Sequence, residues 1–286
     1  MNKTVSIKEI LKSTENTFTK AGVDSPAFDA MCMIEKIFNV TQTDLILNKE
    51  IATTAPLLSQ LDEFVNRRIN GEPLQYILGC WQFYGYAFYV GDGVLIPRDD
   101  TEVLLSVCLD FIKKKPDAKV LDLCSGSGAL AVTIAKETQA DVTAVEKSDK
   151  AFSYLTKNIQ FNNAKVKTVK GDIFTCMDLF DDNSFDLILS NPPYIKTDEI
   201  PTLQKEISFE PVMALDGGAD GYDFYKHIVN CWSTKIKNNG MLAFELGEGQ
   251  FDTVKKLMEA QNYKNIGEKL DLGNIQRVIY GTYVSI

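Results

Sequence analysis

Histidine is almost absent from this sequence: the 286 residues contain one, His227. Metal sites built from several histidines, and mechanisms in which a histidine activates a nucleophile, therefore have almost no material here. His227 lies among apolar residues at helical spacing, which favours a structural role over a catalytic one. Paired cysteines are lacking too, because no two form a C-x-x-C motif, so the sequence indicates neither a zinc site nor a redox centre.

Long hydrophobic runs are also missing. No segment approaches the roughly 18 uninterrupted apolar residues of a membrane span. Charged residues are spread through the first dozen positions and interrupt any signal-peptide core. The scattered cysteines are typical of buried apolar residues in a reducing compartment. We therefore expect a cytoplasmic protein without a membrane partner.

Positive charge is in deficit. The chain has 30 Lys and Arg against 39 Asp and Glu, a net charge of −9. This balance argues against a protein whose main function is to hold nucleic acid phosphates, because such binding depends on clustered Lys and Arg. The 45% hydrophobic and 24% charged residues are typical of a folded soluble protein.

The hydrophobic pattern changes twice along the chain. Residues 1–75 carry apolar residues at helical spacing and predict a small all-α helical bundle. Residues 76–96 are aromatic and rich in glycine, which predicts a β-hairpin linker. In residues 97–286, strand-like runs alternate with helical ones, one of which is expected over 222–236, and two strand-like runs end the chain. This alternation predicts a mostly parallel, Rossmann-like α/β sheet of seven strands with an antiparallel hairpin at its edge.

The first expected strand of this sheet, at 120–123, runs into a glycine-rich turn and then a helix. Such a turn lets the backbone approach a ligand closely. The glycines at 126 and 128 are not followed by one at 131, so the turn is no dinucleotide fingerprint, and no Gly-Lys-Ser/Thr follows to make a P-loop. The candidate ligand-binding residues of this turn are Cys124, Ser125, Gly126, Ser127 and Gly128.

Polar groups also follow the next two strands. Glu146 ends the second strand, where a carboxylate can accept both hydroxyls of a ribose. Asp172 and Ile173 follow the third, where Asp172 can accept from an adenine amino group and Ile173 can cover the ring. Ligands of open α/β sheets bind outside the carboxyl ends of the strands, so the joint pattern is stronger than any single residue.

The fourth strand, at 185–190, ends in Asn191-Pro192-Pro193-Tyr194. This tetrapeptide presents a side-chain carbonyl, a proline-fixed backbone carbonyl and an aromatic face at one sheet edge. These groups suit a planar –NH₂ group that is to be methylated. Asn-Pro and Pro-Pro are also ordinary loop dipeptides, but their position directly after a buried strand favours a functional role.

With these motifs the chain resembles the class I S-adenosylmethionine-dependent methyltransferases and, within them, the release factor glutamine methyltransferases. The resemblance also rests on residues 67–79, 94–102, 210–211 and 214–221, and it covers essentially the whole chain. It implies methyl transfer from S-adenosylmethionine, with S-adenosylhomocysteine as product, to the glutamine of the Gly-Gly-Gln motif in class 1 peptide chain release factors. It also implies that the helical bundle helps to engage the release factor.

The same resemblance assigns roles to residues of this chain. Asn191, Pro192 and Tyr194 would be catalytic, and together with Pro193 they would bind the glutamine. Asn191 would also contact the cofactor, beside Glu146, Asp172, Ile173 and the residues of the glycine-rich turn. The chain departs from the family at Asp99, where proline is usual, and at Cys124, which stands at the first glycine of the turn. A cysteine there is costly if the backbone needs positive φ.

Two other functions remain open. An adenine-N6 or cytosine-N4 nucleic acid methyltransferase also needs a site for a planar amino group, but it must flip a base and grip a phosphate backbone. A non-catalytic binding module would keep the fold without the chemistry. Arg98 and Glu102 are weaker candidates for shaping the cofactor site, with a solvated helix start as the alternative. Arg67 and Arg68 fit an acidic partner surface or a solvated helix end equally well.

Overall fold

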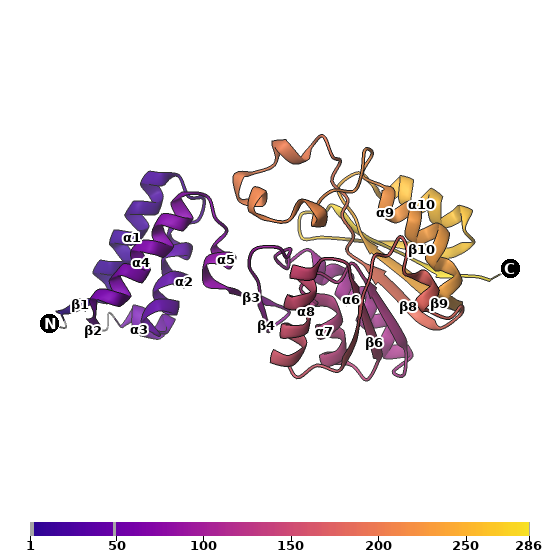
Figure 1. The fold of residues 1–286 in the computed structure, drawn as a ribbon, viewed down its shortest axis with the longest axis horizontal. Helices are drawn as coiled ribbons and strands as arrows, with labels where there is room; N and C mark the ends of the chain where they lie inside the picture. Colours follow the sequence, from indigo (N-terminus) through magenta and orange to yellow (C-terminus); the bar gives the residue numbers. More distant parts are fainter. Residues whose placement is uncertain (1–2, 48–49, 286) are drawn as a thin grey trace. The chain divides into compact units, whose positions relative to one another are not determined.

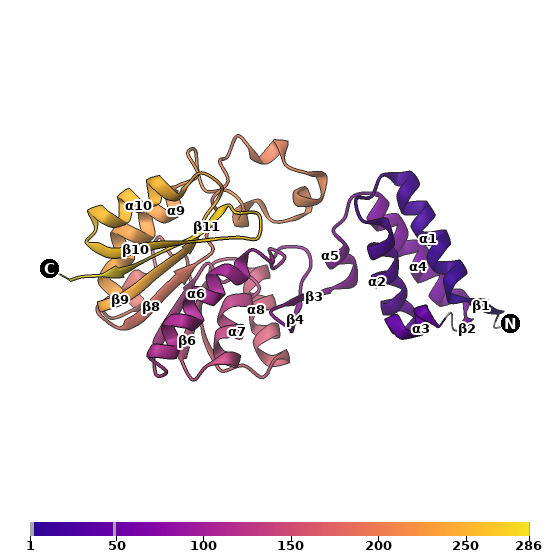
Figure 2. The same cartoon turned by 180° about the vertical axis from the view of Figure 1, so that it is seen from behind.

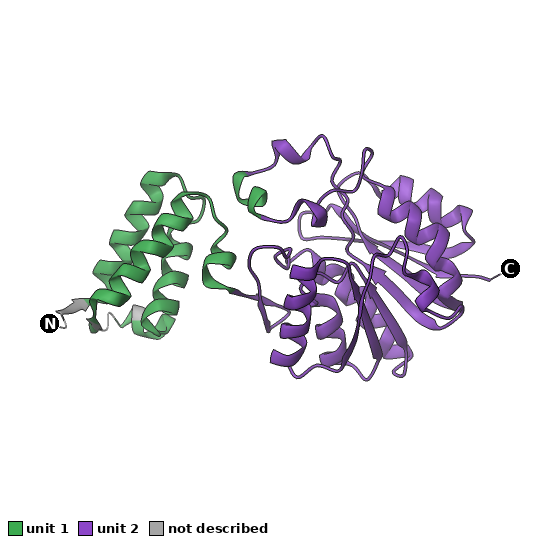
Figure 3. Ribbon diagram, in the orientation of Figure 1, with its two compact units in different colours: residues 1–79, 205–209 green, residues 80–204, 210–286 purple. Residues whose placement is uncertain are grey.

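The structure is a computed structural model that describes residues 3–47 and 50–285. The chain folds into two compact units, Met1–Gly79 with Lys205–Phe209, and Cys80–Gln204 with Glu210–Ile286 (Figure 3). The short segment 205–209 thus leaves the second unit and packs with the first. The functional division at 1–75, 76–96 and 97–286 stays a prediction.

The first unit is a helical bundle, as the apolar spacing predicts. Ile7, Ile10 and Phe18 form the buried stripe of its first helix, which ends at Gly22 in the left-handed region at φ 74°. A short antiparallel ribbon, which the sequence pattern did not indicate, pairs β1 with β2. The elements are β1 (Lys3–Ser6), α1 (Ile7–Ala21), α2 (Pro26–Phe38), α3 (Gln42–Ile46), β2 (Glu50–Thr53), α4 (Ala55–Ile69) and α5 (Leu74–Leu78).

Both arginines at the end of α4 are paired within this unit. Arg68 is 6% exposed and contacts Asp29 at 2.6 Å and Glu206, from the inserted segment, at 2.6 Å. Arg67 makes two hydrogen bonds to Glu72, at 2.8 and 2.6 Å. A buried arginine held by two carboxylates joins residues 205–209 to the bundle. Arg68 is therefore a structural residue, and it is not part of a surface that could bind an acidic partner.

The second unit begins with the predicted hairpin, β3 (Cys80–Phe83) and β4 (Tyr86–Tyr89). Phe83 pairs with Tyr86, so the loop has two residues, Tyr84 and Gly85, with φ of 50° and 78°. Positive φ at both positions is the signature of a type I′ turn, whose twist matches that of the flanking strands.

The main sheet has seven strands in the order β10-β11-β9-β8-β5-β6-β7 (Figures 1 and 2). The five strands from β5 to β9 run parallel, and β11 is antiparallel to both of its neighbours. This confirms the Rossmann-like sheet with an antiparallel hairpin at one edge. The strands are β5 (Lys119–Leu123), β6 (Asp141–Glu146), β7 (Val166–Lys170), β8 (Phe185–Ser190), β9 (Ile236–Glu245), β10 (Tyr263–Leu270) and β11 (Gln276–Tyr283).

Helices cover both faces of the sheet (Figures 1 and 2). Residues of α6 (Thr101–Lys114), α7 (Ala129–Glu137) and α8 (Asp149–Phe161) share one hydrophobic core with one face. A second hydrophobic core joins the other face to residues of α9 (Asp223–His227), the π-helical turn η5 (Ile228–Trp232) and α10 (Phe251–Ala260). Within residues 3–47 and 50–285, none of the helices is both long and apolar enough to cross a bilayer.

The helix that the pattern predicts over 222–236 is divided in the structure. It runs as α9, then the π-helical turn, then a single 3₁₀ turn, Ser233–Lys235. Trp232 ends the π-helical turn, is fully buried and donates its indole N–H to the carbonyl of Ile173 at 3.0 Å. The wider turn places this large side chain under the loop after β7. Such a break has no signature in apolar spacing, because the buried residues still lie on one face.

Candidate active site

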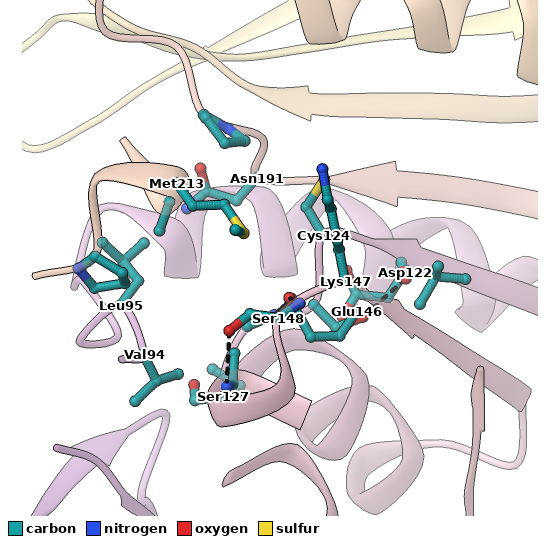
Figure 4. A pocket seen from close by; sticks show the side chains of 18 of the residues that line it. Val94, Leu95, Asp122, Cys124, Ser127, Glu146, Lys147, Ser148, Asn191 and Met213 are labelled. Atoms are coloured by element: carbon teal, nitrogen blue, oxygen red, sulfur yellow. Dashed lines mark hydrogen bonds between the residues drawn. The ribbon is translucent and has the colours of Figure 1, made fainter. Parts of the chain in front are cut away.

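The ends of four parallel strands meet at one edge of the sheet. Leu123 of β5 is level with Val145 of β6 and with Ser190 of β8, and Glu146 of β6 is level with Lys170 of β7. The loops that follow these strands therefore lie together around a cavity of about 290 Å³ (Figure 4). Its lining includes Cys124, Ser125, Gly126, Ser127, Glu146, Asp172, Ile173, Asn191 and Pro193.

Three residues that the sequence also singled out, Gly128, Pro192 and Tyr194, are not among the residues that line this cavity. Gly128 caps α7 with φ 84°, and a Cβ there would lie 2.5 Å from a methyl of Leu155. Pro192 is buried within the turn. Tyr194 packs against the core behind the turn, where its hydroxyl lies 3.4 Å from Oε1 of Glu245. Gly128 therefore acts through close packing of the turn on α8.

The glycine-rich turn has a strained backbone at its first position. Cys124 adopts φ 62°, and Gly126 and Gly128 are also in the left-handed region, at 55° and 84°. A non-glycine residue with positive φ costs about 1–2 kcal/mol. Burial and the neighbouring Glu146 raise the pKa of the Cys124 thiol, so it stays protonated. A Cβ at Gly126 would meet nothing within 4 Å, which leaves the backbone of this turn open toward the cavity.

Glu146 is tied to the turn. Its Oε2 accepts a hydrogen bond from the backbone N–H of Gly126 at 2.9 Å, and its Oε1 accepts one from Ser148 at 2.6 Å. Burial raises the pKa of Glu146, and these backbone donors counteract the rise. An ionised carboxylate has about four acceptor positions, so acceptor capacity remains for ligand hydroxyls.

The loop after β7 combines a charge with an apolar wall. Asp172 contacts Lys147 at 2.8 Å and accepts from the backbone N–H of Phe174 at 3.0 Å. Burial alone would raise the pKa of Asp172, but Lys147 and this hydrogen bond bring it below its usual value. Ile173 is 4% exposed beside them. The Nε2 atom of His227 lies 2.9 Å from the Ile173 carbonyl, and its ring lies 4.4 Å from that of Phe174, as expected for a structural histidine.

The cavity also contains a carboxylate that sequence reasoning missed. Asp122 is 1% exposed and lines the cavity, and within the described chain neither of its carboxylate oxygens has a hydrogen-bond partner. Burial is the largest effect and raises its pKa to about 7, although the nearby Ser125 hydroxyl and the backbone N–H of Ala131 oppose the rise. A buried carboxylate without partners is costly and marks a place for a cationic or donor group. The sequence did contain an indication of this carboxylate, because Asp122 is a charged residue inside an otherwise apolar strand, Val120–Leu123.

The Asn191-Pro192-Pro193-Tyr194 turn is held by side chains from elsewhere in the unit. Asn191 donates from Nδ2 to the Thr101 hydroxyl at 3.2 Å, and Thr101 donates to Oε2 of Glu245 at 2.6 Å. The Tyr194 hydroxyl donates to Oε1 of the same carboxylate at 3.4 Å. Glu245 ends β9, next to β8, where Phe244 is level with Ser190. Neither Thr101 nor Glu245 was a sequence candidate for this turn.

The backbone of the turn is also braced. Gln250 donates from Nε2 to the carbonyl of Tyr194 at 3.0 Å. A Cβ on Gly217 would lie 2.7 Å from the Tyr194 Cα and 2.9 Å from the Pro193 carbonyl oxygen, so only glycine allows this approach. The conformation of the turn is therefore imposed by two distant segments, 215–218 and 247–250.

The weaker candidates Arg98 and Glu102 have different surroundings. Arg98 lines the cavity and forms an ion pair with Glu210, which also accepts from the backbone N–H of Ile96 at 3.2 Å. Arg98 and Glu210 thus join two loops that border the cavity. Glu102 accepts instead from the backbone N–H of Tyr84 at 2.9 Å and supports the hairpin.

Comparison with known proteins identifies this arrangement. Residues 9–79 match the PrmC N-terminal domain, and residues 99–215 match the methyltransferase small domain. Curated relatives named release factor glutamine methyltransferase include those of Thermodesulfovibrio yellowstonii, 38% identical over 86% of both chains, and Geobacter sulfurreducens, 36% identical over 96% of both. The chain belongs to the release factor glutamine methyltransferase family. Its expected membership and its methyltransferase activity are thereby confirmed.

Solved structures support the fold of this release factor glutamine methyltransferase homologue. A methyltransferase from Pyrococcus furiosus superposes with a TM-score of 0.52 at 18% identity, over 81% of this chain and all of the other. The hMettl16 catalytic domain, solved with an RNA hairpin, gives a TM-score of 0.61 at 16% identity, over 76% of this chain and 84% of the other. At these identities the likeness concerns the methyltransferase fold alone.

Proposed function

We propose that this protein transfers a methyl group from S-adenosylmethionine to the side-chain amide nitrogen of the glutamine in the Gly-Gly-Gln motif of class 1 peptide chain release factors. The observation that carries the proposal is Asn191 at the edge of the cavity, in a turn whose side chain and backbone are held from several sides. The identity of the substrate is inferred from the family relationship.

The cavity fits the cofactor on four observations. The unpartnered carboxylate of Asp122 suits the cofactor's ammonium group. The free acceptor positions of Glu146 suit its ribose hydroxyls, and Asp172 with Ile173 suits its adenine. The turn from Cys124 to Gly128 brings the backbone close to the ligand. S-adenosylmethionine, when bound, supplies an electrophilic methyl group on a sulfonium, and S-adenosylhomocysteine is its product.

The substrate nitrogen presents a chemical difficulty, because the lone pair of an amide is delocalised into its carbonyl. We assign the Asn191 side-chain oxygen and the Pro192 backbone carbonyl as acceptors for the two N–H groups of the glutamine. These acceptors orient the nitrogen and favour the positive charge that develops on it. Pro193 stiffens the turn, and Tyr194 braces it from behind through its hydrogen bond to Glu245. Orientation of this kind contributes up to roughly 7–11 kcal/mol to lowering a barrier.

A strong general base is not needed in this scheme. The methylated amide nitrogen is acidic enough to lose its proton to water. This explains how a chain with a single histidine, itself packed against Phe174, can perform the reaction. We further propose that the helical bundle of residues 1–75 engages the release factor and that the protein works in the cytoplasm, where release factors act.

The test is peptide-level mass spectrometry of a purified class 1 release factor incubated with this protein and S-adenosylmethionine. We expect a gain of one methyl group on the glutamine of the Gly-Gly-Gln peptide. Methylation of an added DNA or RNA duplex instead would favour the nucleic acid methyltransferase. Cofactor binding without transfer to either would favour a binding module.

A further inference from the structure

An asparagine side chain can point either of two groups at a substrate. Its carbonyl oxygen accepts hydrogen bonds and its NH₂ donates them, and rotation by a half-turn exchanges the two with little change in shape. A glutamine amide nitrogen needs an acceptor. Asn191 can therefore support methyl transfer in only one of its two orientations.

We propose that Thr101 and Glu245 are positioning residues that fix the side-chain amide of Asn191 with its carbonyl oxygen free for the substrate. This inference rests on the proposed function, because it gives Asn191 the role of acceptor for the glutamine N–H. It adds two residues, distant in sequence, that do not touch the reacting atoms.

The orientation of the Asn191 amide follows from the donors and acceptors of its neighbours. A threonine hydroxyl has one hydrogen, and Thr101 gives it to Oε2 of Glu245 at 2.6 Å. An ionised carboxylate can only accept, so Thr101 has only acceptor capacity left toward Asn191. The partner at 3.2 Å is then the Nδ2 donor of Asn191. With its NH₂ held there, the carbonyl oxygen of Asn191 is the group left for the cavity.

Glu245 also orders the other end of the turn. Its second oxygen accepts from the Tyr194 hydroxyl at 3.4 Å, so one carboxylate holds two residues of the same tetrapeptide. Thr101 and Glu245 are 5% and 2% exposed, so water does not compete for these bonds. Thr101 also lines the cavity, which places the chain of bonds beside the ligand.

The charges around Glu245 come from three neighbouring segments. Arg277 of β11 favours the ionised carboxylate, and Asp100, just before α6, opposes it. Arg277 itself contacts Asp271 at 3.0 Å and Asp100 at 3.5 Å, so its charge is shared. Burial is the largest effect and raises the pKa of Glu245 to about 7. Protonated Glu245 can donate to Thr101, which can then donate to Asn191 and reverse the preferred orientation.

The first measurement compares Thr101→Val with Thr101→Ser. Valine keeps the shape but removes the hydroxyl, whereas serine keeps the hydroxyl. We expect Thr101→Val to lower kcat for release factor methylation about 10-fold, with KM for the release factor and the affinity for S-adenosylmethionine unchanged. Thr101→Ser should stay within about threefold of the wild type. Equal kcat for wild type and Thr101→Val would overturn the proposal.

The second measurement is the pH dependence of kcat. In the wild type, activity should fall as pH drops through about 7, because protonation of Glu245 releases the orientation of Asn191. Thr101→Val removes the hydroxyl that links Glu245 to Asn191, so this acid limb should disappear in that variant. Glu245→Gln should lower kcat and abolish this acid limb. An acid limb that is the same in both variants as in the wild type would contradict this chain of hydrogen bonds from Glu245 through Thr101 to Asn191. A purely structural role of the two residues would leave the acid limb unchanged.

A third measurement does not depend on turnover. In the unliganded protein, the NMR signal of the Asn191 side-chain NH₂ can be assigned by its loss in Asn191→Ala. We expect this signal to shift in Thr101→Val and to stay close to its wild-type position in Thr101→Ser. An unchanged signal in Thr101→Val refutes the hydrogen bond even if the release factor proves not to be the substrate. A shifted signal in a protein that methylates no release factor would instead reject the proposed function.

Discussion

The two sides of the cavity are built in different ways. The turn after β5 contains a strained residue, Cys124 at φ 62°, and starts beside Asp122, a buried carboxylate without a partner in the described chain. The turn after β8 has its side chains and backbone bonded to Thr101, Glu245 and Gln250. The first turn needs a ligand to complete its interactions, and the second is complete in advance. We infer that the first binds the cofactor and the second supplies catalytic orientation.

The largest expected effect tests the pre-organised turn directly. Asn191→Ala removes one of the two acceptors for the glutamine nitrogen. By analogy with the loss of an oxyanion-hole donor, we expect kcat to fall about 10²- to 10³-fold. The affinity for S-adenosylmethionine should change little, because several other residues hold the cofactor. Single-turnover methylation of a release factor and calorimetric titration of the cofactor measure the two quantities.

Normal turnover of Asn191→Ala would reject the assignment of this turn as the catalytic centre. Asn163 provides a matched control, since it too is an asparagine in a loop after a secondary-structure element and is not among the residues that line the cavity. Asn163→Ala should leave kcat within about twofold of the wild type.

A second substitution tests the other side of the cavity, where the turn after β5 is inferred to bind the cofactor. Asp122→Asn removes the buried charge, so the affinity for S-adenosylmethionine should fall about 30-fold if that charge meets the cofactor's ammonium group. The unliganded protein should become more stable near pH 8 by about 1–2 kcal/mol, because ionising Asp122 in the folded state is unfavourable. Calorimetry and denaturant unfolding at several pH values measure both effects.

The sign of the pH dependence follows from the raised pKa of Asp122. The folded protein binds this proton more tightly than the unfolded chain does, since the pKa is about 7 against an ordinary 3.8. The resulting stability is present below pH 3.8 and is lost as pH rises through about 7. Glu245, with its pKa raised to about 7, contributes in the same direction. A stability profile of Asp122→Asn that rises and falls with pH as in the wild type would contradict the assignment.

The bracing of the second turn predicts a smaller effect. Gly217→Ala places a Cβ 2.7 Å from the Cα of Tyr194, a contact that side-chain rotation cannot relieve because its partner is backbone. We expect a loss of stability of about 1–3 kcal/mol and a lower kcat through displacement of the turn. Gly273→Ala is the control, because its nearest neighbour is a side-chain oxygen of Asp271 at 3.2 Å. Thermal unfolding of both variants tests the difference, and equal melting temperatures would refute the bracing.

The smallest expected effect concerns the strain at Cys124. Cys124→Gly relieves a left-handed conformation, which favours the folded state by about 1 kcal/mol, less the small loss of packing. We expect a melting temperature a few degrees higher. Cys231→Gly, in the π-helical turn, should act in the opposite direction because glycine is unfavourable within a helix. Destabilisation of both variants to the same degree would show that the strain at Cys124 is negligible.

The sequence predicted features that depend on near neighbours in the chain. Apolar spacing indicated the bundle and the alternation of strands and helices, and aromatic and glycine residues indicated the hairpin. The polar groups at the strand ends indicated a ligand site. The short ribbon of β1 and β2 escaped notice because its two strands lie far apart in the chain, so no turn between them marks their pairing. The division of the helix over 222–236 escaped because a π-helical turn keeps the buried face continuous.

What the sequence determined by itself is the set of chemical groups at the strand ends: the glycine-rich turn, Glu146, Asp172 and the Asn-Pro-Pro-Tyr turn. Parallel strands bring such groups to one edge whatever else the chain does. The tertiary structure decided which groups are satisfied. Asn191 meets Thr101, 90 residues away, and Thr101 meets Glu245, 144 residues away, whereas Asp122 meets no hydrogen-bond partner among the described residues. Partners at such separations share no local pattern, because only the packing of helix on sheet brings them within hydrogen-bond distance.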